Sequence, residues 1–328
     1  MTDEQIRAQS NAAYNQWCKQ WREHAIIHST FPKKSFSDFE AIGVGKAVLC
    51  VANGFSFEEQ VQTIKENQKN VDILCCDKTL GHLLDNGITP DFCMVCDANV
   101  DYEKYMEKYK DQLSNTILFI NACANPKWSK NGNWKDIYFF VNKDIINSER
   151  EFCKLSGTQN LLPAGTNVSN AMLILLTQSD NEGRKNFFGY DKIILIGFDY
   201  SWKVDGNYYA FDADGGGKRF YMKHSYLTSP AGNFCYTSGN LSFSRDWLQK
   251  YINTFNLPVV QCGPDSILVI GKTGVLEEQM KYSHKQKDQP IVRSALKEMR
   301  EIQSRLNVLQ NQIIKIGKDH WLAHASTV

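Results

Sequence analysis

The fold of this protein is decided by residues 46–99, which read KAVLCVANGFSFEEQVQTIKENQKNVDILCCDKTLGHLLDNGITPDFCMVCDAN. Three short apolar runs in this stretch are separated by polar segments long enough for a helix, and they span 47–51, 71–76 and 92–96. Strands that alternate with helices are typical of a parallel sheet. The stretch therefore predicts an α/β fold.

A polar side chain follows each of these predicted strands. Asn53, Asp77 and Asp97 stand where the three apolar runs end. Parallel sheets bind their ligands beyond the carboxyl ends of the strands. We therefore expect these three residues to lie at a ligand site.

The same pattern continues along the chain. Further strands are expected at Thr116–Asn121, Ile137–Val141, Lys192–Ile196 and Val259–Gln261, and helices at 101–112, 168–177 and 243–255. The fold class predicted from these elements is a mostly parallel sheet with flanking helices.

Two amphipathic helices are expected outside this sheet. Residues 4–27 carry a tryptophan stripe at helical spacing, and 292–316 carry a heptad seam of apolar residues. We therefore predict an N-terminal helix in 1–40, the sheet domain in 41–275 and a C-terminal coiled-coil-like helix in 276–328. The seam predicts pairing with a second copy or another helix.

Composition bounds the function classes. No apolar run reaches the about eighteen residues that a membrane span needs, and 42% of the residues are hydrophobic. The ten cysteines, several within predicted buried strands, fit a reducing compartment, so we expect a soluble cytoplasmic protein. Cys93 and Cys96 have metal-pair spacing, but on a strand their sulfurs point to opposite faces.

The net charge of +1 is unevenly distributed. Residues 281–318 hold nine Lys or Arg against three Asp or Glu, a local charge of 9 minus 3, or +6. Such a segment is either the solvated face of a helix or a contact for an anionic partner such as nucleic acid.

Two glycine turns precede predicted helices. After Asn53-Gly54, Ser56 and Glu59 have capping-box spacing, which predicts a helix that begins near Phe57 with an N-terminus open to an anion. A second turn, Gly165-Thr166-Asn167, precedes the apolar helix at 168–177, and either Thr166 or Asn167 is suited to cap it.

The segment around the last long strand carries acid, base and hydroxyl groups. Asp199 follows a buried strand and is expected at the ligand-binding edge of the sheet. The stretch 205–240 is long for a loop, which favours a lid or binding loop. It contains Tyr209 and His224, residue types that donate to phosphate or transfer a proton.

Four stretches together resemble one known group. Residues 48–57, 73–97 (ending in GITPDFCMVCD), GTNVSNAML and YDKIILIGFDY are similar to the DUF115 group. This group includes the flagellin-modifying motility accessory factors and the archaeal 6-hydroxymethylpterin diphosphokinase. The same stretches resemble the sialyltransferases of glycosyltransferase family 42, and the likeness extends over 48–267.

The resemblance implies a Rossmann-like domain that holds a nucleotide at the strand ends. It places Asn53, Gly54 and Ser56 in a turn that contacts the donor nucleotide, and Gly165 and Thr166 in a second donor-contacting turn.

The resemblance to the sialyltransferases also implies catalytic roles, with departures. Tyr209 matches a tyrosine that donates to the leaving phosphate. Phe55 replaces the usual Pro of the first turn, and Asp77 stands where the sialyltransferases carry Asn. Their general-base His falls near Thr237, so that role is vacant or is taken by another residue.

Three functions are weighed on these grounds. The preferred one is a glycosyltransferase that moves a sugar from a nucleotide-activated donor to a hydroxyl of a glycan, a protein or a modified DNA base. Asn53, Gly54, Ser56, Asp77, Asp97, Gly165, Thr166 and Asn167 would bind the nucleotide. Tyr209 would stabilise the departing phosphate, and His224 or Asp199 would deprotonate the acceptor.

Two alternatives remain. A 6-hydroxymethylpterin diphosphokinase-like enzyme would need Mg²⁺, for which Asp97 and Asp199 are the natural ligands, and this requires the two carboxylates to approach each other. A metal site is expected only under this alternative. The third reading is a catalytically silent assembly module that works through its C-terminal helix.

Overall fold

The computed structural model describes residues 3–143, 146–163, 166–178, 187–204, 209–212 and 224–281, together with Ile302, Arg305 and Leu309. The chain forms two compact units, 1–285 and 286–328. In the second unit the three described residues are helical, and Ile302 and Leu309 expose 57% and 53% of their surface. The rest of the predicted heptad seam lies outside the described residues.

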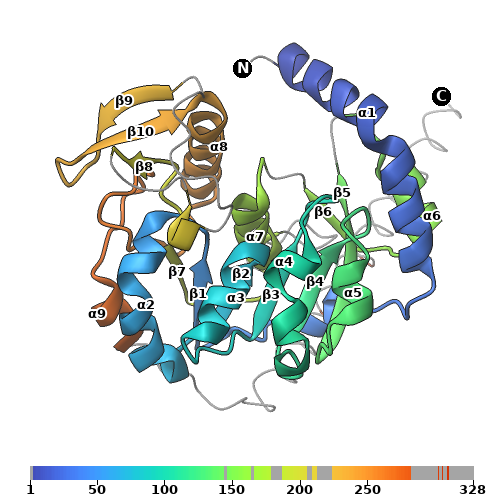
Figure 1. Cartoon of the computed structure of the whole chain (residues 1–328), viewed down its shortest axis with the longest axis horizontal. Coiled ribbons are helices and arrows are strands. Elements are labelled where there is room, and N and C mark those ends of the chain that lie inside the picture. The colour runs from blue at the N-terminus through green and yellow to red at the C-terminus, as the bar shows by residue number, and fades with distance from the viewer. Residues whose placement is uncertain are drawn as a thin grey trace, which may run out of the picture. The chain divides into compact units, whose positions relative to one another are not determined.

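The described part of the first unit contains an eight-stranded sheet with the order β11-β7-β1-β2-β3-β4-β5-β6 (Figure 1). All neighbouring strands in it are parallel. The strands are β1 (Ala47–Val51), β2 (Asp72–Cys76), β3 (Phe92–Val95), β4 (Ile117–Asn121), β5 (Asp136–Lys143), β6 (Leu161–Pro163), β7 (Lys192–Ile196) and β11 (Val259–Gln261). The predicted parallel α/β fold is confirmed.

Helices cover both faces of this sheet, as its continuous apolar strands require. Side chains alternate along β1, so that Val48 and Cys50 join one buried cluster while Leu49 and Val51 join the other. The first cluster packs under α7 (Val168–Thr177), α8 (Gly239–Phe255) and the 3₁₀ turn η1 (Phe36–Phe39). The second packs under α2 (Phe55–Asn67), α3 (Asp77–Asp85), α4 (Tyr102–Tyr105), α5 (Lys127–Asn131) and α9 (Leu276–Lys281). Cys93 and Cys96 contact different clusters, as expected from strand geometry.

Strand order reverses between β1 and β7. From β1 the chain proceeds outward in one direction through β2 to β6, whereas β7 and β11 lie on the other side of β1. Val51, the last residue of β1, is paired with Ile196, the last residue of β7. In open α/β sheets such a reversal opens a crevice at the carboxyl ends of the two strands.

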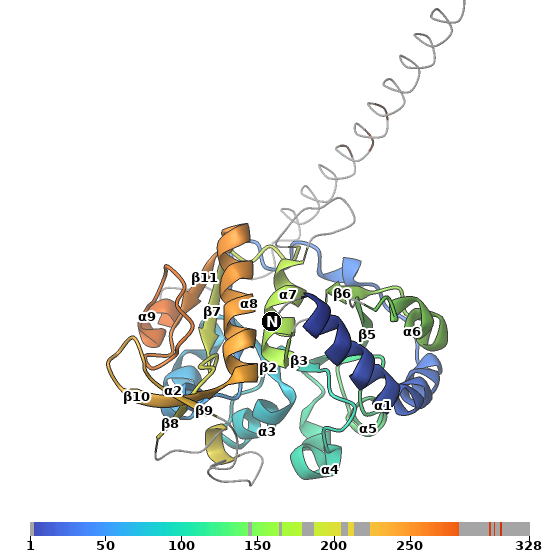
Figure 2. The same ribbon diagram turned by 90° about the horizontal axis from the view of Figure 1, so that it is seen from above.

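The N-terminal helix α1 (Asp3–Ser29) lies against α6 (Glu149–Ser156), side by side in both views (Figure 2). Tyr14 and Arg22 both bond the carboxylate of Glu151, at 2.6 and 2.5 Å. The ring of His28 bonds the carbonyl oxygen of Ala122, just beyond β4, at 2.8 Å. These contacts fix α1 next to the carboxyl ends of β4 and β5.

A second, antiparallel sheet has the order β8 (Trp202–Lys203), β10 (Phe234–Ser238), β9 (His224–Thr228). The prediction of a continuous loop over 205–240 is therefore wrong for the hairpin at 224–238. The sequence does indicate this hairpin, because SPAGN at 229–233 is a turn sequence between two runs rich in aromatic and β-branched residues.

The helix predicted at 101–112 is instead α4 followed by the 3₁₀ helix η3 (Glu107–Gln112). Two further 3₁₀ turns are η2 (Gln68–Asn70) and η4 (Ala210–Asp212). None of the described helices combines the length and the apolar composition needed to cross a membrane.

Candidate functional site

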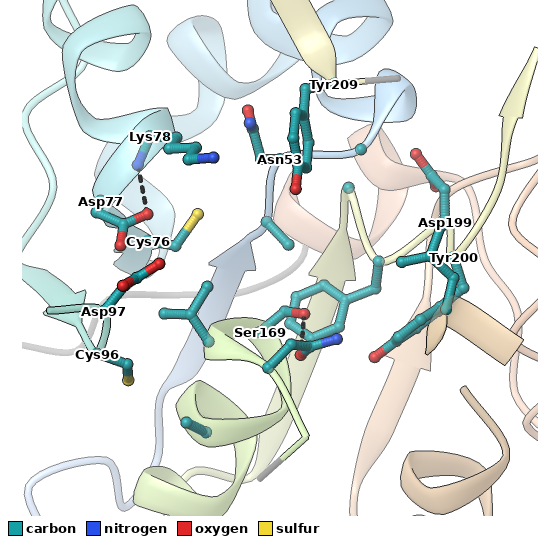
Figure 3. A pocket seen from close by; sticks show the side chains of 18 of the residues that line it. Asn53, Cys76, Asp77, Lys78, Cys96, Asp97, Ser169, Asp199, Tyr200 and Tyr209 are labelled. Atoms are coloured by element: carbon teal, nitrogen blue, oxygen red, sulfur yellow. Dashed lines mark hydrogen bonds between the residues drawn. The ribbon is translucent and has the colours of Figure 1, made fainter. Parts of the chain in front are cut away.

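A pocket of about 390 Å³ opens at the point where the strand order reverses. Most of its lining comes from the segments that follow β1, β2, β3 and β7, and from the first turn of α7, and Asn142, Tyr209 and Leu241 complete it. Asn53, Asp77 and Asp97, the three polar residues expected at strand ends, all line it (Figure 3). The three residues therefore gather at one pocket, as expected for the ends of parallel strands, and ligand binding there stays a prediction.

The segment that follows β1 is hydrogen-bonded to Asp199, which follows β7. The backbone N–H and hydroxyl of Ser56 donate to the two carboxylate oxygens of Asp199, at 2.8 and 2.7 Å. The same hydroxyl accepts the N–H of Gly197 at 2.9 Å. A Cβ on Gly54 would stand 2.3 Å from Asp199 Oδ2, so only glycine permits this approach.

These bonds correct the predicted capping box at Ser56. Helix α2 begins at Phe55 with Gly54 as its N-cap, and Ser56 lies inside the first turn. As a cap the Ser56 hydroxyl would accept a helix N–H, but here it donates to the buried Asp199 carboxylate and accepts the N–H of Gly197. The N–H of Ser56 is thereby occupied, and this end of α2 is less open to an anion than the sequence suggests.

Asp199 is fully buried, and this environment sets its ionisation. Burial raises the pKa of Asp199 to about 6, although both hydrogen bonds from Ser56 act to lower it. The carboxylate lines the pocket, yet each of its oxygens already accepts a hydrogen bond. Its position suits it to hold the turn in shape.

Asn53 has an unsatisfied amide. The residue is 8% exposed and lines the pocket, and neither Nδ2 nor Oδ1 has a hydrogen-bond partner among the residues that the structure describes. Leaving a buried polar group without a partner costs about 1–3 kcal/mol. An amide in this state is suited to a ligand that offers both a donor and an acceptor.

The short η4 segment holds Tyr209 next to Asn53. The N–H of Ala210 donates to the Asn53 carbonyl oxygen at 3.0 Å, and that of Phe211 donates to Glu58 at 2.8 Å. Figure 3 shows the Tyr209 hydroxyl directed into the pocket. The ammonium of Lys78 lies 4.6 Å from the centre of the Tyr209 ring. A hydroxyl and a cation therefore stand together at this end of the pocket.

The second predicted turn forms the N-terminus of α7. Asn167 is its cap, because its side-chain oxygen accepts the N–H of Asn170 at 2.9 Å, and it lines the pocket. Thr166 accepts a bond from Asn170 at 2.7 Å and is absent from the described lining. Gly165 lies outside the described residues.

The carboxylates are distributed over two sides of the pocket. Figure 3 shows Asp77 and Asp97 on one side and Asp199 on the other. Among the residues that the structure describes, no group of three or more His, Cys, Asp or Glu side chains is arranged to hold a metal. His224 belongs to β9, where its backbone pairs with Ser238, and its side chain lies outside the description.

Sequence reasoning missed several lining residues. Lys78, Tyr200 and Asn142 line the pocket, and Tyr200 donates from its hydroxyl to Asn170 at 2.5 Å. Lys78 and Tyr200 directly follow Asp77 and Asp199 in the sequence, and this adjacency could have indicated that they line the same pocket. Asn142 lies at the end of β5, and only the three-dimensional order of strands brings it here.

Comparison with known proteins agrees with this fold and with the resemblance to the DUF115 group. Seven chains of solved structures match, among them the structure of MAf glycosyltransferase from Magnetospirillum magneticum AMB-1, with a TM-score of 0.50 and 14% identity. That alignment covers 80% of this chain and 40% of the other, so this chain spans less than half of that protein. At this identity the likeness shows the fold alone.

No curated protein matches the chain in sequence. The family described as 6-hydroxymethylpterin diphosphokinase MptE-like matches residues 23–205. Because this match covers more than half of the sequence, the chain belongs to the MptE-like family.

Proposed function

We propose that this protein is a glycosyltransferase that moves a sugar from a nucleotide-activated donor to a hydroxyl acceptor. The observation that carries the proposal is the amide of Asn53, which is buried in the pocket where the strand order reverses and has no partner among the described residues. A nucleobase or ribose offers the donors and acceptors that this amide lacks. The solved MAf glycosyltransferase, which has the same fold, supports the assignment.

The charges of the pocket support a donor with few phosphates. Lys78 is the only cation in the described lining, against the acidic side chains of Asp77, Asp97 and Asp199. A triphosphate brings more negative charge to these carboxylates than a sugar nucleotide does. Lys78 and the Tyr209 hydroxyl together would neutralise one departing phosphate.

The geometry does not favour the diphosphokinase alternative in the form in which it was predicted. That alternative requires Asp97 and Asp199 to share Mg²⁺, but the two lie on opposite sides of the pocket (Figure 3). Both oxygens of Asp199 are also bonded to Ser56.

In the proposed sugar transfer, Tyr209, Lys78 and Asp97 have separate roles. The bond between the anomeric carbon and the phosphate oxygen breaks, and the nucleotide leaves with the electron pair while Tyr209 and Lys78 stabilise its charge. The acceptor oxygen forms the new bond to the anomeric carbon, and its proton passes to a base. We assign the base to Asp97, whose side chain is exposed, rather than to the buried Asp199.

A ligand screen tests this function. The Tm of the protein is measured in the presence of CMP, UDP, GDP, ADP and ATP, each with and without Mg²⁺. A ligand at 100 times its Kd adds about 2.7 kcal/mol, which raises Tm by about 5 °C or more. We expect stabilisation by CMP or UDP without metal. A response confined to ATP with Mg²⁺ would favour pyrophosphoryl transfer, and no response to any nucleotide would favour the assembly module.

A further inference from the structure

A second cavity, of about 400 Å³, lies beside the pocket described above. One wall is the helix α1, through Ala13, Trp17 and Trp21, and we call it the α1 cavity. It shares Cys96, Asp97 and Asn142 with the first pocket, so the two spaces meet along these residues.

The lining of the α1 cavity combines aromatic faces with neutral polar groups. Trp17 is 36% exposed, and Trp21 packs edge-on against Phe152 with ring centres 6.2 Å apart. Three amide side chains also line the cavity, those of Asn99, Asn121 and Asn142. The Oδ1 atom of Asn142 is buried and has no hydrogen-bond partner in the part of the chain that the structure describes.

Charge separates the classes of ligand that would fit. No Lys or Arg is among the described residues that line the α1 cavity, and Asp97 is its charged group. A nucleic acid would need cations against its phosphates. A sugar ring needs none, because its C–H face packs on an aromatic ring and its hydroxyls bond amides and carboxylates.

We propose that the α1 cavity binds a sugar unit of a glycan as the acceptor, with its reacting hydroxyl at Asp97. This inference rests on the proposed glycosyltransferase function. The acceptor oxygen attacks the anomeric carbon of the donor as the bond to the nucleotide phosphate breaks, and the acceptor proton passes to the Asp97 carboxylate. The residues shared by the two cavities mark where donor and acceptor meet.

Helix α1 is then a part of the site. Its bonds from Tyr14 and Arg22 to Glu151 hold the helix against α6, and this fixes the two tryptophans over the cavity. An acceptor platform would therefore be supplied by a segment that precedes the sheet in sequence.

Fluorine NMR of the full chain labelled with 5-fluorotryptophan tests this directly. Resonances of Trp17, Trp21 and Trp247 are assigned with single Trp→Phe variants, and Trp247, which stacks on Tyr251 of α8, is the control. The probes are methyl glycosides of glucose, galactose and N-acetylglucosamine, a blocked serine- and threonine-rich peptide, and a short single-stranded oligonucleotide.

We expect at least one methyl glycoside to shift the Trp17 and Trp21 resonances while Trp247 stays unmoved. Trp17→Ala should raise the Kd of that glycoside at least tenfold and leave the nucleotide Kd within twofold. Trp247→Ala should change neither Kd. The inference is overturned if no glycoside shifts these resonances, or if the peptide or the oligonucleotide shifts them instead.

The two proposals fail in different ways. Nucleotide binding without a glycoside response leaves the glycosyltransferase standing and removes the acceptor assignment. Absence of any nucleotide response overturns the proposed function, and the acceptor role falls with it even if a glycoside binds.

Discussion

Ser56 and Asp199, 143 positions apart in the sequence, are joined by two hydrogen bonds across the point where the strand order reverses. One residue of the turn after β1 thus fixes one residue of the turn after β7. The pocket lined by Asn53 and Asp199 has its shape because these two segments are held together.

Ser56→Ala should lower the free energy of unfolding by about 1–3 kcal/mol. The change removes the hydroxyl that donates to Asp199 and leaves the buried N–H of Gly197 without its acceptor. Urea denaturation measures the loss. The control is Ser37→Ala, which removes an exposed hydroxyl bonded to Ser35 and should alter stability by less than about 0.5 kcal/mol. Equal losses of unfolding free energy in the two variants would show that the contact between Ser56 and Asp199 does not stabilise the fold.

Asp199 should make stability depend on pH. Burial raises its pKa to about 6 from 3.8, so between these values the folded state keeps a proton that the unfolded state has released. Its contribution to the free energy of unfolding is complete below pH 3.8 and is lost as pH rises through 6, a change of about 3 kcal/mol.

The comparison of wild type with Asp199→Asn isolates this effect. The stability difference between the two proteins should shrink by up to about 3 kcal/mol between pH 4 and pH 7. Asp246→Asn, which removes a carboxylate with 64% of its side chain exposed, is the control and should show a far smaller change. A difference for Asp199→Asn that stays constant with pH would show that the carboxyl titrates normally.

Asn53→Ala should separate binding from stability. The amide bonds no other group in the described part of the chain, so its removal should leave the free energy of unfolding unchanged or raise it by about 1 kcal/mol. Nucleotide affinity measured by calorimetry should fall by about tenfold or more, which is about 1.4 kcal/mol.

Asn170→Ala provides the opposite case. Its amide bonds Thr166, Tyr200 and the carbonyl oxygen of Ser244, so this variant should lose about 2–3 kcal/mol of stability. If Asn53→Ala were destabilised to the same extent, its amide would have a partner in the protein and the binding argument would fail.

Tyr209→Phe should slow turnover without loss of donor affinity. Removing the hydroxyl takes away one donor to the departing phosphate, and we expect kcat to fall about tenfold or more while the nucleotide Kd stays within twofold. Tyr226→Phe, on the exposed face of the hairpin, is the control. A weaker Kd with normal kcat would place Tyr209 in ground-state binding instead.

Gly197→Ala should be among the most damaging substitutions in the sheet. Gly197 has φ +73°, and a Cβ there would stand 2.0 Å from the carbonyl oxygen of Ala52. We expect a loss of about 3 kcal/mol or more. Gly239→Ala, with no atom within 4 Å of the added Cβ, should be neutral or stabilising by up to about 1 kcal/mol in the same denaturation experiment.

The sequence predicted those parts of the fold that local pattern controls. Strands β7 and β11 were placed to the residue because continuous apolar runs bounded by polar residues leave little choice. The gathering of Asn53, Asp77 and Asp97 followed from one rule about parallel sheets.

The misses concern contacts between distant residues. Ser56 has a local capping pattern, and only the position of β7 beside β1 shows that Asp199 takes its hydrogen bonds. Likewise, the tryptophans of α1 predicted a packing face, but not that Trp17 and Trp21 would line a cavity next to Asp97. Neither spacing nor periodicity encodes which strand or loop a helix meets.

The adjacency of β1 and β7 also has a consequence for synthesis. At about 5–20 residues per second, a ribosome needs on the order of ten seconds to add the 143 positions that separate Ser56 from Asp199. During that interval the nascent chain holds β1 with one side unpaired, and an unpaired strand invites association with other chains. The pocket lined by Asn53 and Asp199 cannot form until β7 has emerged, so chains cut short before β7 lack this pocket and are prone to aggregate.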